Sequence, residues 1–191
     1  MTKKEITLLG VLFLCLVIVM YIFFRNQVKE APLSSETHQK SERKDEEETI
    51  QKKKILLFFP SEEDSLLHGE EREIISSSLL IEEARQVVEE LLKGSNEGYI
   101  SPFPPETKLR ELFLTEEGVA YVDFSRDIQE KHISGSSAEL ATIYSIVNSL
   151  VYNFKPIKKV FILVEGREKE TLGGHINLSQ AFKPEFDLVA K

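Results

Sequence analysis

The sequence contains a single cysteine and no excess of basic residues, and both features exclude some classes of protein function. Cys15 lies inside an apolar run, so the chain has neither a disulfide framework nor a metal site built from several thiolates. The 191 residues include 24 Lys and Arg against 32 Asp and Glu, a net charge of −8. Within residues 55–191 the same counts are 14 and 24, net −10. We therefore expect no nucleic-acid partner, because an acidic surface repels phosphates.

The sequence also lacks the short motifs of common catalytic sites. It contains no Gly-x-Ser-x-Gly elbow, no phosphate-binding loop, no His-Glu-x-x-His pair and no cluster of cysteine and histidine residues. The four histidines are far apart along the chain, namely His38, His68, His132 and His175. We therefore expect no enzymatic activity, no metal site and no cofactor.

One enzymatic alternative stays open, because two carboxylates that flank a glycosidic bond can hydrolyse it. Glu165 with Glu170, or Asp123 with Asp127, has the residue types of a hydrolase of the peptidoglycan cell wall. Pairs of acidic residues are expected by chance in so acidic a chain, so the alternative is disfavoured. Some aromatic side chains could stack on a sugar or a peptide, although packing within the domain is the simpler interpretation. These residues are Tyr99, Phe103, Tyr121 and Tyr152.

Residues 6–24 contain no charged side chain and predict a transmembrane helix. At about 1.5 Å per residue, this run approaches the ~30 Å thickness of the hydrocarbon core. No small-residue cleavage site follows it, which favours an uncleaved signal anchor over a removed signal peptide. A lipoprotein signal would need small residues before its cysteine, whereas Phe13 and Leu14 precede Cys15.

Basic residues flank both ends of this apolar run, so charge alone does not fix the orientation. Lys3 and Lys4 lie in the short tail of residues 1–5, while more basic residues follow the run. A long domain can cross the membrane despite its charges. We expect a single-pass protein of the cell membrane with its domain outside the cytoplasm, mainly because of the family resemblance below.

Residues 25–54 have few apolar side chains and many charges of both signs. Such a segment cannot bury enough apolar surface to fold alone. We predict that it is a flexible linker between the membrane helix and the domain.

Apolar periodicity predicts an α+β domain over residues 55–182, followed by a tail of residues 183–191. Strands are expected near 55–59 and 66–75, a helix over 81–92, a hairpin over 109–124, a second helix over 136–154, and strands over 160–164 and 176–178. The predicted order is ββαββαββ. It indicates a mixed β-sheet with two helices packed on one face.

The second helix is predicted to begin with a capping box, in which Ser136 and Glu139 bind each other's backbone N–H groups. Fifteen uncharged residues follow Glu139, up to Lys155. An ordinary solvated helix face would carry charges, so we predict that the face opposite the apolar stripe contacts a partner. Its residues are Ala141, Thr142, Ser145, Asn148, Ser149 and Tyr152. The alternative is that the first helix or the tail of the same chain covers it.

Several ordered motifs resemble the GerM domain family of sporulation and spore germination proteins. They are GVAYVDFS at 118–125, GS at 135–136, IVNSL at 146–150, VFILVEG at 160–166 and ETLGGH at 170–175. The segments LLKG at 91–94 and ISP at 100–102, up to Lys108, fit the same pattern. One departure is Gly94-Ser95, where the family often has Gly-Pro. The resemblance spans about 55–182.

The resemblance implies a domain exposed outside the cytoplasmic membrane of endospore-forming bacteria. It also implies similarity to the ring-building motif, and it brings no catalytic residues. We expect a membrane-anchored scaffold that acts through protein-protein assembly, with peptidoglycan binding or hydrolysis as the alternative. The expected partners are the membrane, and other extracytoplasmic proteins or further copies, with peptidoglycan as a lesser candidate. Gly173, Gly174 and His175 form a candidate functional turn, although a histidine bonded to nearby backbone is the simpler interpretation.

Overall fold

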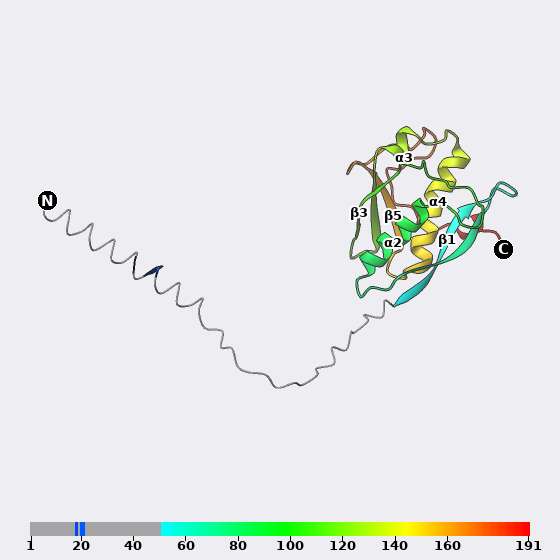
Figure 1. Ribbon diagram of the computed structural model, residues 1–191. Helices are drawn as coiled ribbons and strands as arrows, with labels where there is room; N and C mark the ends of the chain where they lie inside the picture. The colour runs from blue at the N-terminus through cyan, green and yellow to red at the C-terminus, as the bar shows by residue number, and fades with distance from the viewer. Residues whose placement is uncertain (1–17, 19, 22–50) are drawn as a thin grey trace, which may run out of the picture. The chain divides into compact units, whose positions relative to one another are not determined.

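The computed structural model describes residues 18, 20, 21 and 51–191 (Figure 1). The chain separates into two compact units, Met1–Glu46 and Glu47–Lys191. Within the described residues, no helix is long and apolar enough to cross a membrane. The predicted membrane helix of residues 6–24 and the linker of residues 25–54 lie for most of their length outside the described residues.

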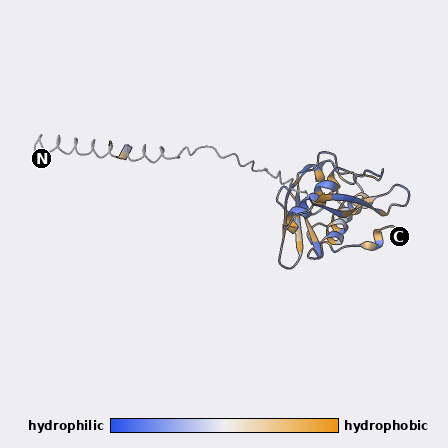
Figure 2. Cartoon of the chain, turned by 60° about the horizontal axis from the view of Figure 1, so that its bottom comes forward, coloured by the Kyte–Doolittle hydropathy of each residue, from blue (hydrophilic) through white to orange (hydrophobic). Residues whose placement is uncertain are grey.

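The second unit is an α+β domain, as the sequence predicts. In chain order its elements are β1 (Lys52–Pro60), β2 (Leu67–Ile75), α2 (Leu80–Leu92), β3 (Leu109–Leu114), β4 (Val119–Phe124), α3 (Asp127–Glu130), α4 (Ser136–Asn153), β5 (Lys159–Val164) and the 3-10 helix η1 (Phe186–Leu188). The short helix α3 lies between the predicted hairpin and the second predicted helix, where the sequence predicts no element. Figure 2 shows that hydrophobic and hydrophilic stretches alternate throughout this domain.

The strands form two sheets, which corrects the prediction of one mixed sheet. One sheet is the antiparallel pair β1-β2, and the other has the order β3-β4-β5. Within the second sheet, β3 and β4 form an antiparallel hairpin, whereas β4 and β5 run parallel and are connected through α4. The three-stranded sheet is therefore mixed, as predicted, but it does not include β1 and β2.

Helix α4 separates the two sheets because its side chains bind the free edge of β1. The backbone N–H of Leu56 donates to Asn153 Oδ1 at 3.0 Å, and Asn153 Nδ2 donates to the Leu56 carbonyl oxygen at 2.7 Å. The N–H of Phe58 donates to Ser149 Oγ at 3.0 Å. These bonds take the place of a neighbouring strand, so no further strand can pair with β1 there.

The core lies between α2, α4 and the inner face of the three-stranded sheet. Helix α2 contacts β3, α4 contacts β5, and the two helices contact each other (Figure 1). Both helices cover the same face of this sheet, as predicted. The buried side chains of that face alternate along the strands, as expected for a sheet packed on one side. They are Leu112, Ala120, Val122, Phe124, Val160, Ile162 and Val164.

A buried ion pair fastens β2 to the end of α2. Glu70 is 1% exposed, and its carboxylate accepts from Arg72 Nε at 2.7 Å and from Ser95 Oγ at 2.6 Å. Arg72 Nη1 also donates to the carbonyl oxygen of Glu90 at 3.0 Å. Burial alone would raise the pKa of Glu70, but the hydrogen bonds from Ser95 and Arg72 outweigh it and lower the pKa. The carboxylate is therefore used for structure.

The domain begins earlier than predicted. Lys53 Nζ lies 2.5 Å from Glu83 Oε2 at the start of α2, and the N–H of Ser76 donates to the Gln51 carbonyl oxygen. The boundary predicted between residues 54 and 55 falls inside β1, because lysines that look like linker residues extend the strand as far as Lys52.

The predicted strand over residues 176–178 is absent, which corrects the end of the expected order. Leu178 is buried without strand pairing, and its N–H donates to the Glu170 carbonyl oxygen. Phe182 instead forms an isolated antiparallel bridge with Val160 of β5. Residues 183–191 also belong to the domain, because Glu185 is hydrogen-bonded to Asn148 of α4.

Candidate functional site

The outer face of the three-stranded sheet carries a row of three stacked aromatic rings, which we call the aromatic ladder. Phe113, Tyr121 and Phe161 occupy directly paired positions on β3, β4 and β5. The ring centroids of Phe113 and Tyr121 are 4.8 Å apart with the rings 6° from parallel, and those of Tyr121 and Phe161 are 5.1 Å apart at 22°. The exposed fraction increases from 8% at Phe161 to 48% at Phe113. The ladder is therefore most open at β3.

An apolar groove continues from the ladder around the edge of β3. It is lined by Phe113 and Leu114 of the strand and by Leu79, Leu80 and Ile81 at the start of α2. Leu79 is 59% exposed. Contiguous apolar surface of this kind on a folded domain is typical of an interaction site.

Asp123 lies beside the ladder on the same face but is buried. Arg110 Nη1 donates to its Oδ2 at 2.8 Å, and the backbone N–H of Gly166 donates to its Oδ1 at 2.8 Å. Glu165 Oε2 is 4.0 Å from the same Arg110 nitrogen. Oδ1 of Asp123 thus holds the turn after β5, while Oδ2 binds Arg110 of β3.

The Gly173-Gly174-His175 turn is organised by Glu139 of α4. Glu139 is fully buried, and its Oε1 accepts from the backbone N–H of His175 at 3.0 Å and from His175 Nδ1 at 2.7 Å. Its Oε2 accepts from the N–H of Ile176 at 3.0 Å. A Cβ atom on Gly173 would meet Glu139 Oε1 at 3.0 Å, and Gly174 has a φ of +103°, so both positions favour glycine.

These contacts explain why Glu139 is ionised inside the domain. Burial by itself would raise the pKa of Glu139, but hydrogen bonds from Ile176 and His175 outweigh burial and lower it. The predicted capping box is consequently wrong. Gly135 is the N-cap residue of α4 with no side-chain cap, because the Glu139 carboxylate points to the turn and not to the start of its own helix.

The predicted partner face of α4 is mostly internal, which corrects the prediction. Thr142, Ser145, Asn148 and Ser149 are fully buried. The hydroxyl of Thr142 donates to the Pro102 carbonyl oxygen at 2.7 Å, and Asn148 Nδ2 donates to that of Glu185 at 2.9 Å. This face is covered by strand β1, by the loop that precedes β3 and by the C-terminal tail. The tail therefore helps to cover the face, as the alternative interpretation predicted.

Two residues of that predicted face remain accessible. Tyr152 is 57% exposed and packs edge-on against Phe58, with ring centroids 5.6 Å apart. Ala141 lines an apolar pocket of about 250 Å³ beside the start of α4. Ile133 at this pocket is 72% exposed.

Comparison with known proteins identifies the family. The profile of the Germane family, described as sporulation and spore germination, matches residues 56–170, which is more than half of the chain. The chain is a member of the Germane family. A comparison with curated proteins gives no significant match.

Solved structures share the fold of the Germane domain. The first GerMN domain of the sporulation protein GerM from Bacillus subtilis is 19% identical, with a TM-score of 0.56 over 69% of this chain and 97% of that one. The tandem GerMN domains of the same protein are 18% identical, with a TM-score of 0.58 over 70% of this chain and 46% of that one. A Clostridium perfringens protein assigned as a lipoprotein is 22% identical, with a TM-score of 0.51 over 74% and 95%.

The candidate hydrolase residues of the Germane domain are largely occupied by structural contacts. Asp123 binds Arg110, and Asp127 binds Lys131 at 3.0 Å. Glu165 Oε1 accepts from the backbone N–H of Arg126 at 3.0 Å, whereas Glu170 is exposed. Within residues 51–191 and the three described residues before them, no three His, Cys, Asp or Glu side chains are grouped to hold a metal ion.

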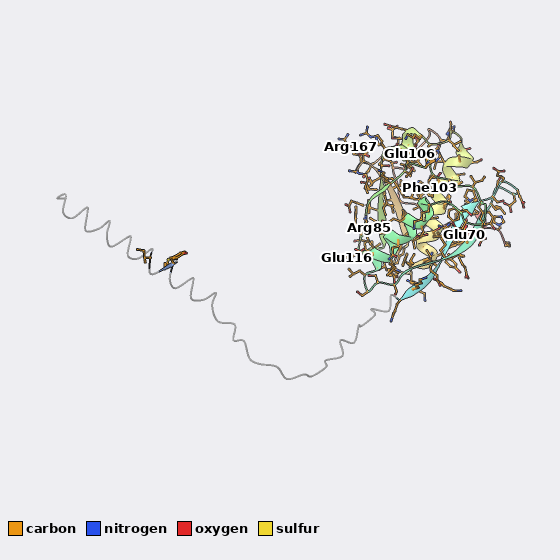
Figure 3. The ribbon with its side chains drawn as sticks, in the orientation of Figure 1. Glu70, Arg85, Phe103, Glu106, Glu116 and Arg167 are labelled. Carbon is orange, nitrogen blue, oxygen red and sulfur yellow. The ribbon has the colours of Figure 1, made fainter. Side chains whose placement is uncertain are left out.

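The described histidines of the Germane domain each contact a different partner. His68 stacks on Tyr99 at 5.1 Å, and His132 Nε2 is 2.8 Å from Thr142 Oγ1. Phe103 is buried in the core, as the packing interpretation predicts, and is labelled in Figure 3. His38 lies outside the described residues.

Sequence reasoning missed the aromatic ladder as a unit. Phe113, Tyr121 and Phe161 each occupy an outward position of a strand, on the face opposite the core. Recognising the three rings as one row requires knowing that β4 and β5 pair in parallel, and the pattern of residues along each strand does not reveal this pairing.

Proposed function

We propose that the protein is a membrane-anchored scaffold in sporulation or spore germination, whose Germane domain acts outside the cytoplasm through protein-protein assembly. The observation that carries this proposal is the exposed aromatic ladder with its adjoining groove. The sheet has helices on its inner face, while Phe113 and Leu79 remain about half exposed on the folded domain. Apolar surface left open in this way favours a protein partner.

The geometry of the ladder favours a protein over a glycan. A sugar stacks on the flat face of an aromatic ring, so a binding platform needs free ring faces. In the ladder, Tyr121 has Phe113 on one side and Phe161 on the other, and its two ring faces are covered. The outer face of the Phe113 ring is not covered by another ring of the ladder. It opens toward an apolar groove, and none of the residues that line this groove has a side chain that could bind a sugar hydroxyl. Peptidoglycan binding is therefore the weaker alternative.

The proposal includes no enzymatic activity, which the use of the buried carboxylates supports. Asp123 and Glu139 each bind backbone N–H groups of a turn, and Glu70 binds Arg72 and Ser95. A general acid or base needs a site where a substrate proton can reach it. Release of muropeptides from purified peptidoglycan by the protein would contradict this part of the proposal.

The proposed anchor is the uncharged run of residues 6–24, and its support comes from the sequence. Extraction of membranes with alkaline carbonate should leave the full-length protein in the membrane pellet. Release of a species about 25 residues shorter would instead indicate a cleaved signal peptide.

A matched pair of substitutions tests the assembly function. Phe113→Lys places a charge on the ladder, and Ile133→Lys places the same charge at an even more exposed apolar residue elsewhere on the domain. In the bacterium that encodes the chain, Phe113→Lys should reduce heat-resistant or germinating spores at least tenfold. Ile133→Lys should leave them unchanged.

Both variants must keep the circular dichroism spectrum of the unsubstituted protein. Normal spores with Phe113→Lys would contradict the proposed use of the ladder. A loss with Ile133→Lys alone would place the function at the pocket beside α4 and would contradict it as well.

A further inference from the structure

We propose that two copies of the Germane domain pair antiparallel through the free edges of β3, which joins their three-stranded sheets into one mixed six-stranded sheet. The inference rests on the proposed function and names its partner as a second copy of this chain. It is carried by the open edge of β3, by the spacing of the aromatic ladder and by the charges along the strand.

The edge of β3 has unpaired backbone groups. The strand pairs with β4 and with no other strand, and the N–H of Thr115 donates to the Val119 carbonyl oxygen at the hairpin. Since alternate residues of an antiparallel strand face its partner, Phe113 and Glu111 direct their N–H and C=O groups to β4. Those of Leu112 and Leu114 point outward, and nothing in the described part of the chain bonds to them.

The other strand edges of the described domain are each bonded at some positions by the chain itself. Asn153 and Ser149 bind the edge of β1, and Phe182 exchanges two backbone hydrogen bonds with Val160 of β5. On β2, Gln86 binds the N–H and the C=O of Ile75, each at 2.8 Å, and the N–H of Ala190 donates to the Leu67 carbonyl oxygen. Such bonds hinder unwanted strand pairing, so the edge of β3, which has none and lies beside an apolar groove, is suited to a specific strand.

The spacing of the aromatic ladder fits an additional strand. Neighbouring strands lie about 4.7–4.9 Å apart, and the ring centroids of Phe113 and Tyr121 are separated by 4.8 Å. A strand added to β3 would therefore place a side chain over the free face of the Phe113 ring. A second β3 supplies Phe113 for this position, which extends the row from three rings to six.

Ring stacking and charge together favour one register for this pairing. With Phe113 opposite Phe113 of the second copy, Leu112 lies opposite Leu114, Glu111 opposite Thr115, and Arg110 opposite Glu116. Figure 3 labels Glu116 on the same side of the domain as Arg85, whose Nη1 lies 3.7 Å from Glu111 Oε2. A shift by one residue per strand would oppose Phe113 to Glu111 or to Thr115 and would lose the contact between the two Phe113 rings. A shift by two residues per strand would oppose Glu111 to Glu111, and like charges directly opposite each other destabilise a sheet.

Cysteine cross-linking tests both the pairing and the register. The full-length chain with Cys15→Ser contains no other cysteine, so new cysteines report single contacts. A chain with Glu111→Cys and a second chain with Thr115→Cys are mixed in detergent and treated with copper-phenanthroline. The mixture should form a disulfide-linked dimer at least tenfold more than either chain alone, because directly opposite Cβ atoms are about 4.5–5.5 Å apart.

The matched control replaces Thr115→Cys by Glu71→Cys on β2. The Glu71 side chain is 71% exposed, whereas Thr115 is only partly exposed, so random collision would link the control mixture at least as readily as the first. Equal linking of the two mixtures, or no linking of the first, overturns the proposal.

If the first mixture fails to link while Phe113→Lys still abolishes sporulation, the ladder binds a different protein and the proposed function stands. If linking occurs but Phe113→Lys has no effect on spores, the proposed function fails and the pairing stands.

Discussion

Helix α4 and strand β3 both have polar groups where a partner would lie, yet the domain uses the two elements in opposite ways. The polar side chains of α4 are buried and bind the edge of β1, the tail and the 173–176 turn. The outward groups of β3 bind nothing in the described domain, and Phe113 beside them is half exposed. Polar groups along an element therefore indicate a contact without indicating whether the contact is internal.

The difference has a thermodynamic basis. A backbone N–H or C=O group buried without a partner costs free energy, so the edge of β1 beneath α4 must be hydrogen-bonded. The edge of β3 meets water, which satisfies its backbone groups until a strand replaces it. Substitutions on α4 should accordingly affect stability, whereas substitutions at the β3 edge should affect association.

The largest effect is expected at Glu139. Glu139→Gln keeps the size of the side chain but loses its charge, and it turns an N–H group toward the donors of the turn. We expect a loss of about 3 kcal/mol of unfolding free energy, as for a broken buried charge network. This corresponds to a fall in Tm of roughly 10 °C in thermal denaturation near neutral pH.

The same residue predicts a pH dependence. Because the pKa of Glu139 is lower in the folded protein than its unfolded value of about 4.3, its stabilisation is complete above that value and is lost as pH falls through the folded pKa. The Tm difference between the unsubstituted protein and Glu139→Gln should therefore shrink as pH falls below about 4.3. A difference that persists unchanged at lower pH would contradict the assignment of Glu139 as a buried anion.

The second largest effect is expected at Asn153, which closes the β1 edge. Asn153→Ala leaves the N–H and C=O of Leu56 without partners and should cost about 2 kcal/mol in chemical denaturation. Gln86→Ala is the matched control, since Gln86 binds Ile75 in the same two-bond manner. Ile75 is 55% exposed, so water can replace the amide and the loss should be smaller. Equal losses of unfolding free energy in the two variants would contradict the argument that the edge of β1 is more deeply buried than the end of β2.

The sequence predicts the elements of this domain better than their contacts. The apolar stripe of α4, the β3-β4 hairpin and the α+β class follow from local periodicity, and the ordered motifs indicate the family. The pairing of Asn153 with Leu56 joins residues 97 positions apart and leaves no local signal. The strand predicted over residues 176–178 fails for a related reason, because the backbone there bonds to Glu139 and Glu170 instead of a neighbouring strand.

The candidate site was predicted less well than the fold, for a physical reason. Ser145 and Ser149 are equally small and neutral. Residues of this kind suit contact with a partner protein and contact with an internal strand edge equally well, so the sequence does not distinguish the two. The role of Glu139 was hidden because its spacing from Ser136 fits a capping box equally well. The three rings of the aromatic ladder are separated by up to 48 positions, so their stacking depends on sheet order.

A smaller effect is expected from two serines one turn apart on α4. Ser145 and Ser149 are both fully buried, but Ser149 Oγ accepts from Phe58 at 3.0 Å, whereas Ser145 Oγ has no hydrogen-bond partner in the described part of the domain. Ser149→Ala should lower the unfolding free energy by about 1 kcal/mol. Ser145→Ala should leave it unchanged or raise it, because it removes an unpaired buried hydroxyl. The reverse order in urea denaturation would show that α4 does not close the β1 edge through Ser149.

The smallest effect on stability is expected at Phe113, where the effect on association should be greatest. Phe113→Lys exchanges a half-exposed ring on an edge strand for a side chain that reaches water, so the unfolding free energy should change by about 0.5 kcal/mol.

If β3 edges pair, the unsubstituted domain is stabilised by mass action and its Tm should rise with protein concentration. The Tm of Phe113→Lys should be independent of concentration over the same range, measured on chains beginning at Glu47, where the second compact unit starts. Ile133→Lys should keep the concentration dependence, since Ile133 lies outside both the ladder and the groove. A concentration dependence that survives Phe113→Lys would show that β3 is left open for some other reason than pairing with its own copy.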